Sequence, residues 1–321
     1  MGHVAIIGAG VAGLTAAAEL LAAGHRVTIV DRAEGLGPAQ CSWWAGGMLA
    51  PWCERESAEQ EVVDWGAAAA DWWEAHTPLT RAGTLVVAPA RDRAELSRFA
   101  RRTTNFTEVD EAGIATLEPD LAGRFRHGLF FAEEAHLDPR KALASLTEHL
   151  TNAGAQLHFG SQDVPPADLT LDCRGMAAAD CLTDLRGVKG EMALIRTREI
   201  SLSRPVRLLH PRHPIYLVPR GEGVYMLGAT MIESADRSRV TLRSMLELLG
   251  AAYALHPAFA EAEILETGTD IRPAFPDNLP RVTPIEGGFA INGLYRHGFL
   301  LSPAMAKRAA TAVTRALSEA A

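Results

Sequence analysis

The stretch "HVAIIGAGVAGLTAAAELLAAGHRVTIVDR", residues 3–32, decides the fold of this chain. Four apolar residues precede Gly8, a helix-forming run follows Gly13, and a second apolar run ends at Asp31. This order of strand, glycine-rich turn, helix and strand is typical of a βαβ unit that binds a dinucleotide. We predict strands over residues 4–7 and 27–30 and a helix over residues 15–23.

The three glycines of the GxGxxG pattern have separate mechanical roles. Gly8 permits the tight turn from strand to helix, and Gly10 lets the backbone approach a pyrophosphate at the helix N-terminus. Gly13 allows the helix and strand to pack closely, and Asp31 is placed to accept hydrogen bonds from an adenosine ribose. From this unit we expect cofactor contacts by Gly8, Ala9, Gly10, Val11, Ala12, Gly13, Asp31 and Arg32.

A glycine-rich loop after this unit favours FAD over NAD as the dinucleotide. Residues 35–54, "GLGPAQCSWWAGGMLAPWCE", carry no strand pattern, and in many FAD enzymes such a loop runs along the cofactor to its isoalloxazine ring. The sequence has no second GxGxxG, so the substrate rather than a nicotinamide is the expected reductant. No cysteine follows Cys181, which excludes covalent attachment of the flavin through a C-terminal cysteine. From the loop we expect cofactor contacts by Cys41, Ser42, Gly46, Gly47, Met48 and Leu49.

The composition indicates a folded chain with a surplus of acidic residues. The 321 residues include 31 Lys and Arg and 39 Asp and Glu, for a net charge of −8. This balance argues against a nucleic acid as partner, although one or two local arginines can still bind a small anion. The four cysteines have neither CxxC nor zinc-site spacing, which predicts no metal site and a reduced, cytoplasmic protein. Without a basic N-terminal region or a run of 18 apolar residues, we expect neither a signal peptide nor a membrane span.

Nucleotide-binding signals lie at both ends and in the middle of the chain, whereas the segments between them indicate antiparallel sheet. Residues 216–231, "YLVPRGEGVYMLGATM", predict a hairpin with its turn over residues 221–223. Because a chain of this length exceeds the usual size of one core, we predict an α/β protein of two domains, each discontinuous in sequence. The first is a Rossmann-like FAD domain of the glutathione-reductase type, over residues 1–78, 136–176 and 266–321. The second is an antiparallel-sheet substrate domain, over residues 79–135 and 177–265.

Proline and capping residues predict where two further helices begin. One is expected to start with Asp138 as its cap and Pro139 as its first residue. The last helix is expected to start with Ser302 as its cap and Pro303 as its first residue. All six tryptophans lie within residues 43–73, and those after residue 60 recur at helical spacing. We interpret this spacing as a core or subunit-interface helix.

Motifs spread over nearly the whole chain resemble those of the D-amino-acid oxidase family of flavoproteins, and within it the glycine oxidases of bacterial thiamine biosynthesis. Besides the opening stretch, they are "AGGMLAPWCE" (45–54), "HLDPRKALASL" (136–146), "YLVPR" (216–220), "GATM" (228–231), "DIRPAFPDNLP" (270–280) and "GLYRHGFLLSPAM" (293–305). The resemblance implies the D-amino-acid oxidase fold. It implies oxidation of the Cα–N bond of a small amino acid such as glycine, sarcosine or D-alanine to an imine, which gives glyoxylate or supplies the thiazole of thiamine. It also implies that non-covalent FAD takes the electrons and that O2 reoxidises it to give H2O2.

The resemblance further implies a set of site residues. The carboxylate-binding arginines fall on Arg272 and Arg296, the pocket tyrosine on Tyr216 and a wall residue on Met231. An arginine fork binds a carboxylate in a bidentate way. Tyr216 either caps the pocket or donates a hydrogen bond to the carboxylate. The remaining cofactor contacts are expected from Val164, Gly175, Leu294, Tyr295, His297, Gly298, Phe299, Leu300 and Leu301.

Three points about these residues stay open in the sequence. Taken singly, Arg296 is better interpreted as a surface salt bridge, whereas the presence of two such arginines in Gly- and Pro-containing motifs favours ligand binding. Arg174 replaces a small residue of the family pattern in "CRGM", residues 173–176, and faces either solvent or the pyrophosphate. Direct hydride transfer needs no acid–base group, so we assign neither His297 nor His210 as a base.

Other functions compete with glycine oxidation. One is a sarcosine or broader D-amino-acid oxidase, or a dehydrogenase that passes electrons to a quinone. Another is a tRNA-modifying flavoprotein module, which would need a basic surface, and a third is a non-catalytic FAD-binding subunit, which would not need both arginines. We expect the partners to be a small amino acid and O2, with no nucleic acid or membrane, and a homo-oligomer of two or four chains.

Overall fold

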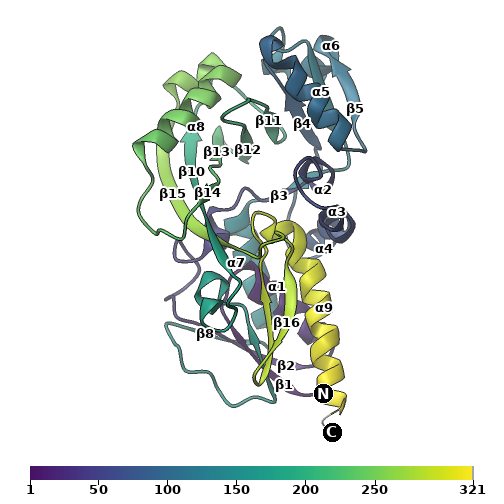
Figure 1. Cartoon of the computed structure of the whole chain (residues 1–321), viewed down its shortest axis with the longest axis vertical. Helices are drawn as coiled ribbons and strands as arrows, with labels where there is room; N and C mark the ends of the chain where they lie inside the picture. The colour runs from purple at the N-terminus through teal and green to yellow at the C-terminus, as the bar shows by residue number, and fades with distance from the viewer. Residues whose placement is uncertain (320–321) are drawn as a thin grey trace.

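The computed structural model describes residues 1–319, which form two lobes with both chain ends in the lower one (Figure 1). The lower lobe holds a six-stranded sheet in the order β16 (Arg281–Ile285), β17 (Gly288–Asn292), β9 (Leu169–Asp172), β1 (His3–Ile7), β2 (Arg26–Asp31) and β8 (Gln156–Phe159). The upper lobe holds a nine-stranded sheet. Its order is β14 (Ile232–Glu233), β10 (Arg186–Arg196), β13 (Val224–Gly228), β12 (Ile215–Gly221), β11 (Val206–Leu208), β4 (Thr84–Val87), β6 (His127–Phe131) and β5 (Thr107–Asp110), with β15 (Glu263–Ala274) paired to β10.

The βαβ unit predicted from the opening stretch is present in the lower sheet. β1 lies between β2 and β9 and runs parallel to both. The connecting helix α1 (Val11–Ala22) packs against α7 (Pro139–Asn152) and α9 (Gly298–Glu319). A Cβ atom at Gly13 would lie 1.9 Å from the Gly8 carbonyl oxygen, so only glycine allows this approach of helix and turn.

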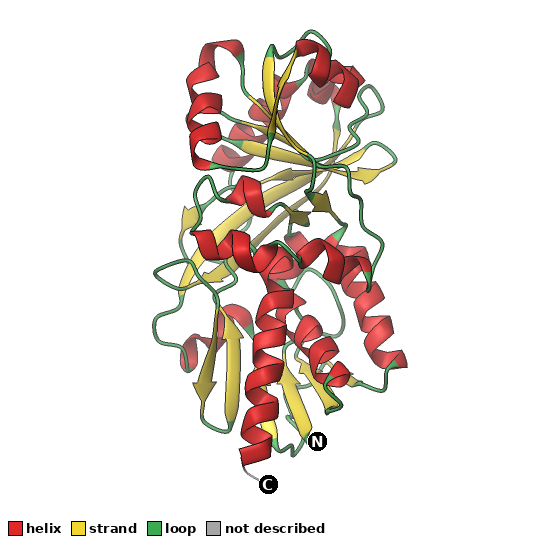
Figure 2. Cartoon of the chain, turned by 90° about the vertical axis from the view of Figure 1, so that its right-hand side faces the viewer, coloured by secondary structure: helices red, strands yellow, loops and turns green. Residues whose placement is uncertain are grey.

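The last helix begins earlier than the sequence predicts. α9 starts at Gly298, so Ser302 is not its cap and Pro303 lies inside it. Figure 2 shows α9 as the long helix that leads down to the C mark. A proline inside a helix leaves the carbonyl four residues earlier without its usual donor. That carbonyl, on Phe299, instead accepts a hydrogen bond of 2.7 Å from the indole N–H of Trp73. The long-range bond compensates for the proline, which a local capping rule cannot detect. By contrast, α7 begins as predicted, with Asp138 as its cap.

The upper lobe contains the predicted antiparallel sheet with one exception, because β11 and β4 run parallel to each other. β12 and β13 form the expected hairpin, and positive φ angles at Gly221, Glu222 and Gly223 allow its tight turn. Helix α8 (Leu242–Leu255) covers one part of this sheet, and α5 (Arg93–Arg102) and α6 (Glu111–Leu117) cover another. The domain boundary predicted at residue 266 falls inside β15, and the boundaries stay a prediction.

Short elements connect the two lobes. The loop predicted over residues 35–54 contains a 3-10 turn (Cys41–Trp44), strand β3 (Met48–Leu49) and helix α2 (Pro51–Glu54). β3 pairs with β7 (Ala135–His136) and is only two residues long, too short for an alternating pattern to show. The tryptophans that follow lie on two helices, α3 (Gln60–Gly66) and α4 (Ala69–Glu74), rather than one, and Trp72 and Trp73 are buried in the core. Within residues 1–319, none of the helices combines the length and apolar character needed to cross a membrane.

Candidate active site

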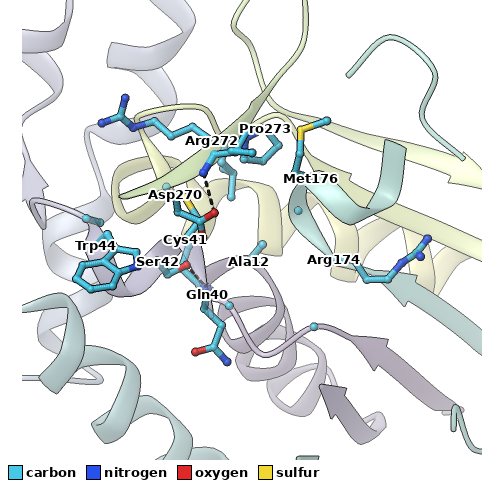
Figure 3. A pocket seen from close by; sticks show the side chains of 18 of the residues that line it. Ala12, Gln40, Cys41, Ser42, Trp44, Arg174, Met176, Asp270, Arg272 and Pro273 are labelled. Carbon is cyan, nitrogen blue, oxygen red and sulfur yellow. Dashed lines mark hydrogen bonds between the residues drawn. The ribbon is translucent and has the colours of Figure 1, made fainter. Parts of the chain in front are cut away.

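A cavity of about 500 Å³ reaches from the carboxyl ends of β1 and β2 to the β10–β15 pair of the upper sheet (Figure 3). Ile7 and Asp31 line it at the end of the parallel strands, and Gly190 and Arg272 line it on the upper sheet. Ligands of parallel α/β sheets bind at the carboxyl ends of the strands. One cavity therefore has two ends: the end at β1 and β2 is suited to a dinucleotide, and the other end lies against the upper sheet.

The glycine-rich turn at the lower end leaves backbone open to the cavity. Gly8 has φ +106°, and a Cβ atom there would lie 2.6 Å from the Cys173 carbonyl oxygen. Gly10 precedes α1 and lines the cavity. The Ser42 hydroxyl accepts a hydrogen bond of 3.0 Å from the N–H of Val11, the first residue of that helix. Gly10 itself places no side chain at this helix N-terminus, which fits the approach of a pyrophosphate group.

Asp31 fixes the turn and borders the cavity at the same time. Its two carboxylate oxygens accept hydrogen bonds from the N–H groups of Ala9, at 2.6 Å, and Ala33, at 2.8 Å. A carboxylate oxygen can accept a further bond, so Asp31 fits the ribose contact expected for it. Val164 also borders this end, on a segment without strand structure.

The predicted cofactor contacts divide into two groups. Those that line the cavity are Gly8, Gly10, Val11, Ala12, Asp31, Arg32, Cys41, Ser42, Gly46, Val164, Gly175, Leu294, Tyr295, Gly298 and Phe299. Those outside its lining are Ala9, Gly13, Gly47, Met48, Leu49, His297, Leu300 and Leu301. Members of the second group support the walls: Leu300 and Leu301 are core residues, and a Cβ atom at Gly47 would lie 2.2 Å from the Leu137 carbonyl oxygen.

Arg174, which the sequence left open, is bound to two carboxylates. Its guanidinium lies 2.7 Å from Asp172 and 2.8 Å from Asp180. Figure 3 shows this side chain extending away from Ala12 and Gln40. The pairing gives Arg174 partners within the protein and does not require a pyrophosphate.

Arg272 presents its guanidinium at the upper end of the cavity. The side chain passes over Gly190, where a Cβ atom would lie 2.3 Å from Nη2. Its Nη1 donates a hydrogen bond of 2.9 Å to the Thr230 carbonyl oxygen. Within residues 1–319, no aspartate or glutamate oxygen lies within 4.0 Å of this guanidinium. Because a partly buried guanidinium favours an anionic partner, Arg272 fits the binding of a carboxylate from outside the chain.

Arg296, the second predicted clamp, already has a carboxylate partner. Its Nη2 lies 3.0 Å from Glu54 Oε2 and 2.5 Å from the Ser57 hydroxyl. Arg207 also pairs with Glu54. The salt-bridge interpretation therefore applies to Arg296 in part, although Arg296 still lines the cavity. Two guanidiniums share one carboxylate, which leaves a surplus of positive charge beside the cavity.

The Glu54 carboxylate stays ionised despite its burial. Burial alone would raise its pKa, but the guanidiniums of Arg296 and Arg207 outweigh burial and hold the pKa well below its usual value. His297 Nε2 lies 2.9 Å from the same carboxylate. Burial lowers the pKa of His297 and outweighs the contact with Glu54, which raises it. The imidazole is therefore neutral and donates a hydrogen bond to Glu54.

Tyr216 and Met231 lie at different depths. Cβ atoms at Gly228 and Gly46 would lie 2.7 Å and 3.0 Å from the Tyr216 side chain, so the ring fits only between glycines. Burial raises the pKa of Tyr216, which keeps its hydroxyl a hydrogen-bond donor. Met231 is 54 % exposed and outside the cavity lining. Its sulfur contacts the Tyr295 hydroxyl at 3.5 Å, at the rim rather than the wall.

Sequence reasoning missed several cavity residues from the upper sheet, from the loop over residues 35–54 and from the connection between β13 and α8, namely Gln40, Trp44, Glu191, Arg237 and Asp270. Asp270 precedes Arg272 by two residues on β15, so strand alternation places both on one face. Burial raises the pKa of Asp270. The Trp44 ring covers Gly268, two residues earlier on the same face. The period-two pattern along β15 is the signal that could have found Asp270.

Known proteins resemble the chain over nearly its whole length. The family model described as "FAD dependent oxidoreductase" matches residues 3–312. A Rhizobium etli protein named "Putative thiamine biosynthesis oxidoreductase ThiO" is 59 % identical over 95 % of this chain and 94 % of its own length. A Pseudomonas aeruginosa glycine oxidase is 28 % identical over 94 % of this chain and 92 % of its own. The crystal structure of glycine oxidase from Geobacillus kaustophilus superposes with a TM-score of 0.82 at 23 % identity, over 98 % of this chain and 95 % of that one.

The chain belongs to the DAO family of FAD-dependent oxidoreductases. The expected family, the D-amino-acid oxidase fold, the enzyme class and FAD as cofactor are thereby confirmed. The roles of the individual site residues stay predictions.

Proposed function

We propose that this enzyme oxidises glycine, or another small α-amino acid, at its Cα–N bond. The observation that carries the proposal is Arg272, a guanidinium at the cavity without a carboxylate partner among the described residues. An α-amino acid carries the group that such a guanidinium binds in a bidentate way. The relatives named for glycine oxidation and for thiamine biosynthesis support the same substrate class.

In the proposed reaction, the substrate loses a hydride from Cα and a proton from nitrogen and becomes an imine. FAD, when bound, supplies the acceptor for the hydride, and O2 takes up the two electrons and two protons to give H2O2. The imine then hydrolyses to glyoxylate or serves as the precursor of the thiamine thiazole. The protein supplies orientation and electrostatics rather than a chemical group of its own.

Three side chains account for substrate orientation in this proposal. Arg272 binds the carboxylate, and the protonated Tyr216 hydroxyl donates a second hydrogen bond to it. Arg296, held by Glu54, adds positive potential beside the same space. These positively charged side chains are held in place before the substrate enters. The site therefore binds a carboxylate with little loss of free energy to side-chain rearrangement.

Large side chains around the Arg272 end of the cavity favour small substrates. Tyr216 fills the space between Gly46 and Gly228, and the Trp44 ring covers Gly268. We therefore rank glycine and sarcosine above amino acids with large side chains. An H2O2 assay over glycine, sarcosine, D-alanine, D-proline, D-phenylalanine and the L-amino acids tests this order. Faster oxidation of D-phenylalanine than of glycine would contradict it, and the absence of H2O2 with every amine would contradict the reaction itself.

A further inference from the structure

A buried ion pair on β10 lies beside the proposed carboxylate-binding arginine. Lys189 and Glu191 are 3 % and 0 % exposed, and Nζ lies 3.6 Å from Oε1. Buried charges need protein partners in place of water. The partners of this pair lie on residues 229–241, here named the bridge segment, which connects β13 to α8.

Both members of the pair hold the bridge segment. The Lys189 ammonium donates hydrogen bonds to the Ser238 hydroxyl at 2.8 Å and to the Arg239 carbonyl oxygen at 3.3 Å. Glu191 Oε1 accepts a bond of 3.1 Å from the N–H of Thr241, the cap of α8. The middle and the far end of the segment are thereby attached to β10.

The near end of the bridge segment is attached through Thr230. Its N–H donates to the Glu191 carbonyl oxygen at 3.1 Å, as in a regular antiparallel pair. In a regular pair, the Glu191 N–H would donate to the Thr230 carbonyl in return. It donates instead to the Thr230 hydroxyl at 2.9 Å, and that hydroxyl lies 3.4 Å from the Glu191 carboxylate.

This exchange of a hydroxyl for a carbonyl has a consequence for Arg272. Because the Thr230 hydroxyl satisfies the Glu191 N–H, the Thr230 carbonyl oxygen is released from the ladder and accepts the bond from Arg272 Nη1. The guanidinium also lies over the bare backbone of Gly190, where a Cβ atom would lie within 2.8 Å of Nη2, Cζ and Nη1. The orientation of Arg272 therefore depends on which atom of Thr230 pairs with β10.

We propose that Thr230, held by Glu191, is a positioning residue for the substrate-binding guanidinium of Arg272. The inference rests on the proposed function, in which Arg272 binds the substrate carboxylate. Without the hydroxyl, the Glu191 N–H competes for the Thr230 carbonyl, and Arg272 loses the acceptor that orients it.

The test compares Thr230→Val, which replaces the hydroxyl with a methyl group, and Thr230→Ser, which retains it, in the FAD-loaded enzyme. Glycolate, a carboxylate without an amine, is titrated through the absorbance of the bound flavin, which separates binding from turnover. We expect the glycolate dissociation constant to rise about tenfold in Thr230→Val, as for loss of one hydrogen bond to a charged group, and to stay near the wild-type value in Thr230→Ser. Flavin content is expected to stay equal in all three.

The same titration of Arg272→Met separates this inference from the proposed function. Unchanged glycolate binding in Arg272→Met would overturn the carboxylate-binding role that the proposed function gives to Arg272, and the positioning role with it. Loss of binding in Arg272→Met together with wild-type binding in Thr230→Val would overturn the positioning role alone. If Thr230→Val does not fold, Thr230→Ala removes the hydroxyl without adding a second methyl group and carries the same expectations.

Discussion

The guanidinium of Arg296 lies 3.0 Å from the carboxylate of Glu54, a residue from the opposite end of the sequence. The bond ties the segment before α9 to helix α2, and Arg207 from the upper sheet pairs with the same carboxylate. One buried acidic group therefore connects three separate parts of the chain. The arginine that the sequence offered as a substrate clamp has a structural partner as well.

Replacing Glu54 with glutamine is expected to destabilise the fold. The substitution Glu54→Gln would keep the shape of the side chain but leave two guanidiniums without their common counter-charge. Removal of one partner of a buried pair costs roughly 3–5 kcal/mol. Urea unfolding of the FAD-loaded enzyme measures the loss. Glu59→Gln, at an exposed position nearby, is the matched control and should unfold like the wild type.

The destabilisation by Glu54→Gln is expected to depend on pH in one direction. The pKa of Glu54 is held well below its usual value, so its stabilising effect is present above the unfolded-state pKa of about 4.3 and is lost as the pH falls through the folded-state pKa. The difference between wild type and variant should stay constant from about pH 6 to about pH 8 and shrink below about pH 4. A difference that grows on acidification would show that Glu54 is not ionised in the folded protein.

Glu134 is expected to show the opposite pH dependence. It is fully buried, accepts a hydrogen bond of 2.8 Å from the Cys53 N–H, and has a pKa raised to about 7 by burial. Stability from a raised pKa is present below the unfolded-state value and is lost as the pH rises through the folded-state value. At about pH 8, Glu134→Gln should therefore stabilise the fold by up to about 3 kcal/mol, and at about pH 5 by much less.

Urea midpoints at about pH 5 and about pH 8, with FAD in excess, measure the effect of Glu134→Gln. The neighbouring exposed residue Glu133 supplies the control variant, Glu133→Gln, which should show no such pH-dependent gain. Equal midpoint shifts of Glu134→Gln at both pH values would mean that burial does not raise the pKa of Glu134.

Alanine substitutions at two glycines of the turn are expected to have different effects, one on folding and the other on FAD binding. A Cβ atom at Gly13 would lie 1.9 Å from a backbone oxygen, so Gly13→Ala should prevent the native packing of α1. A Cβ atom at Gly10 would lie 3.4 Å from the Ser42 hydroxyl and face the cavity. Gly10→Ala should therefore fold but bind FAD at least about tenfold more weakly, a change of about 1.4 kcal/mol.

Thermal unfolding without FAD and fluorescence titration with FAD distinguish the two glycine variants. A folded Gly13→Ala enzyme, or a Gly10→Ala enzyme with wild-type FAD affinity, would contradict the roles assigned to these residues.

Local signals in the sequence predict the parts of this fold that depend on local physics. The βαβ unit follows from glycine spacing and apolar runs, and the cap at Asp138 follows from the residue pair Asp138–Pro139. The start of α9 does not follow from such rules, because the Trp73 indole supplies the bond that makes Pro303 tolerable inside the helix. That contact joins residues from distant parts of the chain, and no short window contains both.

In the candidate site, too, some features follow from the sequence and others depend on contacts between distant parts of the chain. Motif resemblance places Arg272, Arg296 and Tyr216 at one cavity. It does not reveal that Glu54 pairs with Arg296, or that the Thr230 carbonyl accepts a bond from Arg272, because both relationships are made by tertiary packing. Asp270 lay within reach of sequence reasoning, since alternation along β15 places it on the face of Arg272.

The two arginines are expected to differ when each is replaced by methionine. Arg272→Met should keep bound FAD and raise the apparent dissociation constant of glycine at least about 30-fold, because removing one side of a buried charge pair costs roughly 2–5 kcal/mol. Arg272→Lys should recover little, since an ammonium cannot reproduce the planar fork. Arg296→Met should weaken the binding of glycine less than Arg272→Met does. It should also lower the stability of the fold, because it removes one of the two guanidiniums paired with Glu54.

Anaerobic stopped-flow bleaching of the flavin at rising glycine concentration measures both arginine variants, and urea unfolding measures their stability. If both guanidiniums bind one carboxylate, the double variant should lose less than the sum of the two single losses. If Arg296 acts only through Glu54, the losses in glycine affinity should add. Wild-type affinity in Arg272→Met, with a large loss in Arg296→Met, would transfer the substrate carboxylate to Arg296 and leave Arg272 as a structural residue of β15.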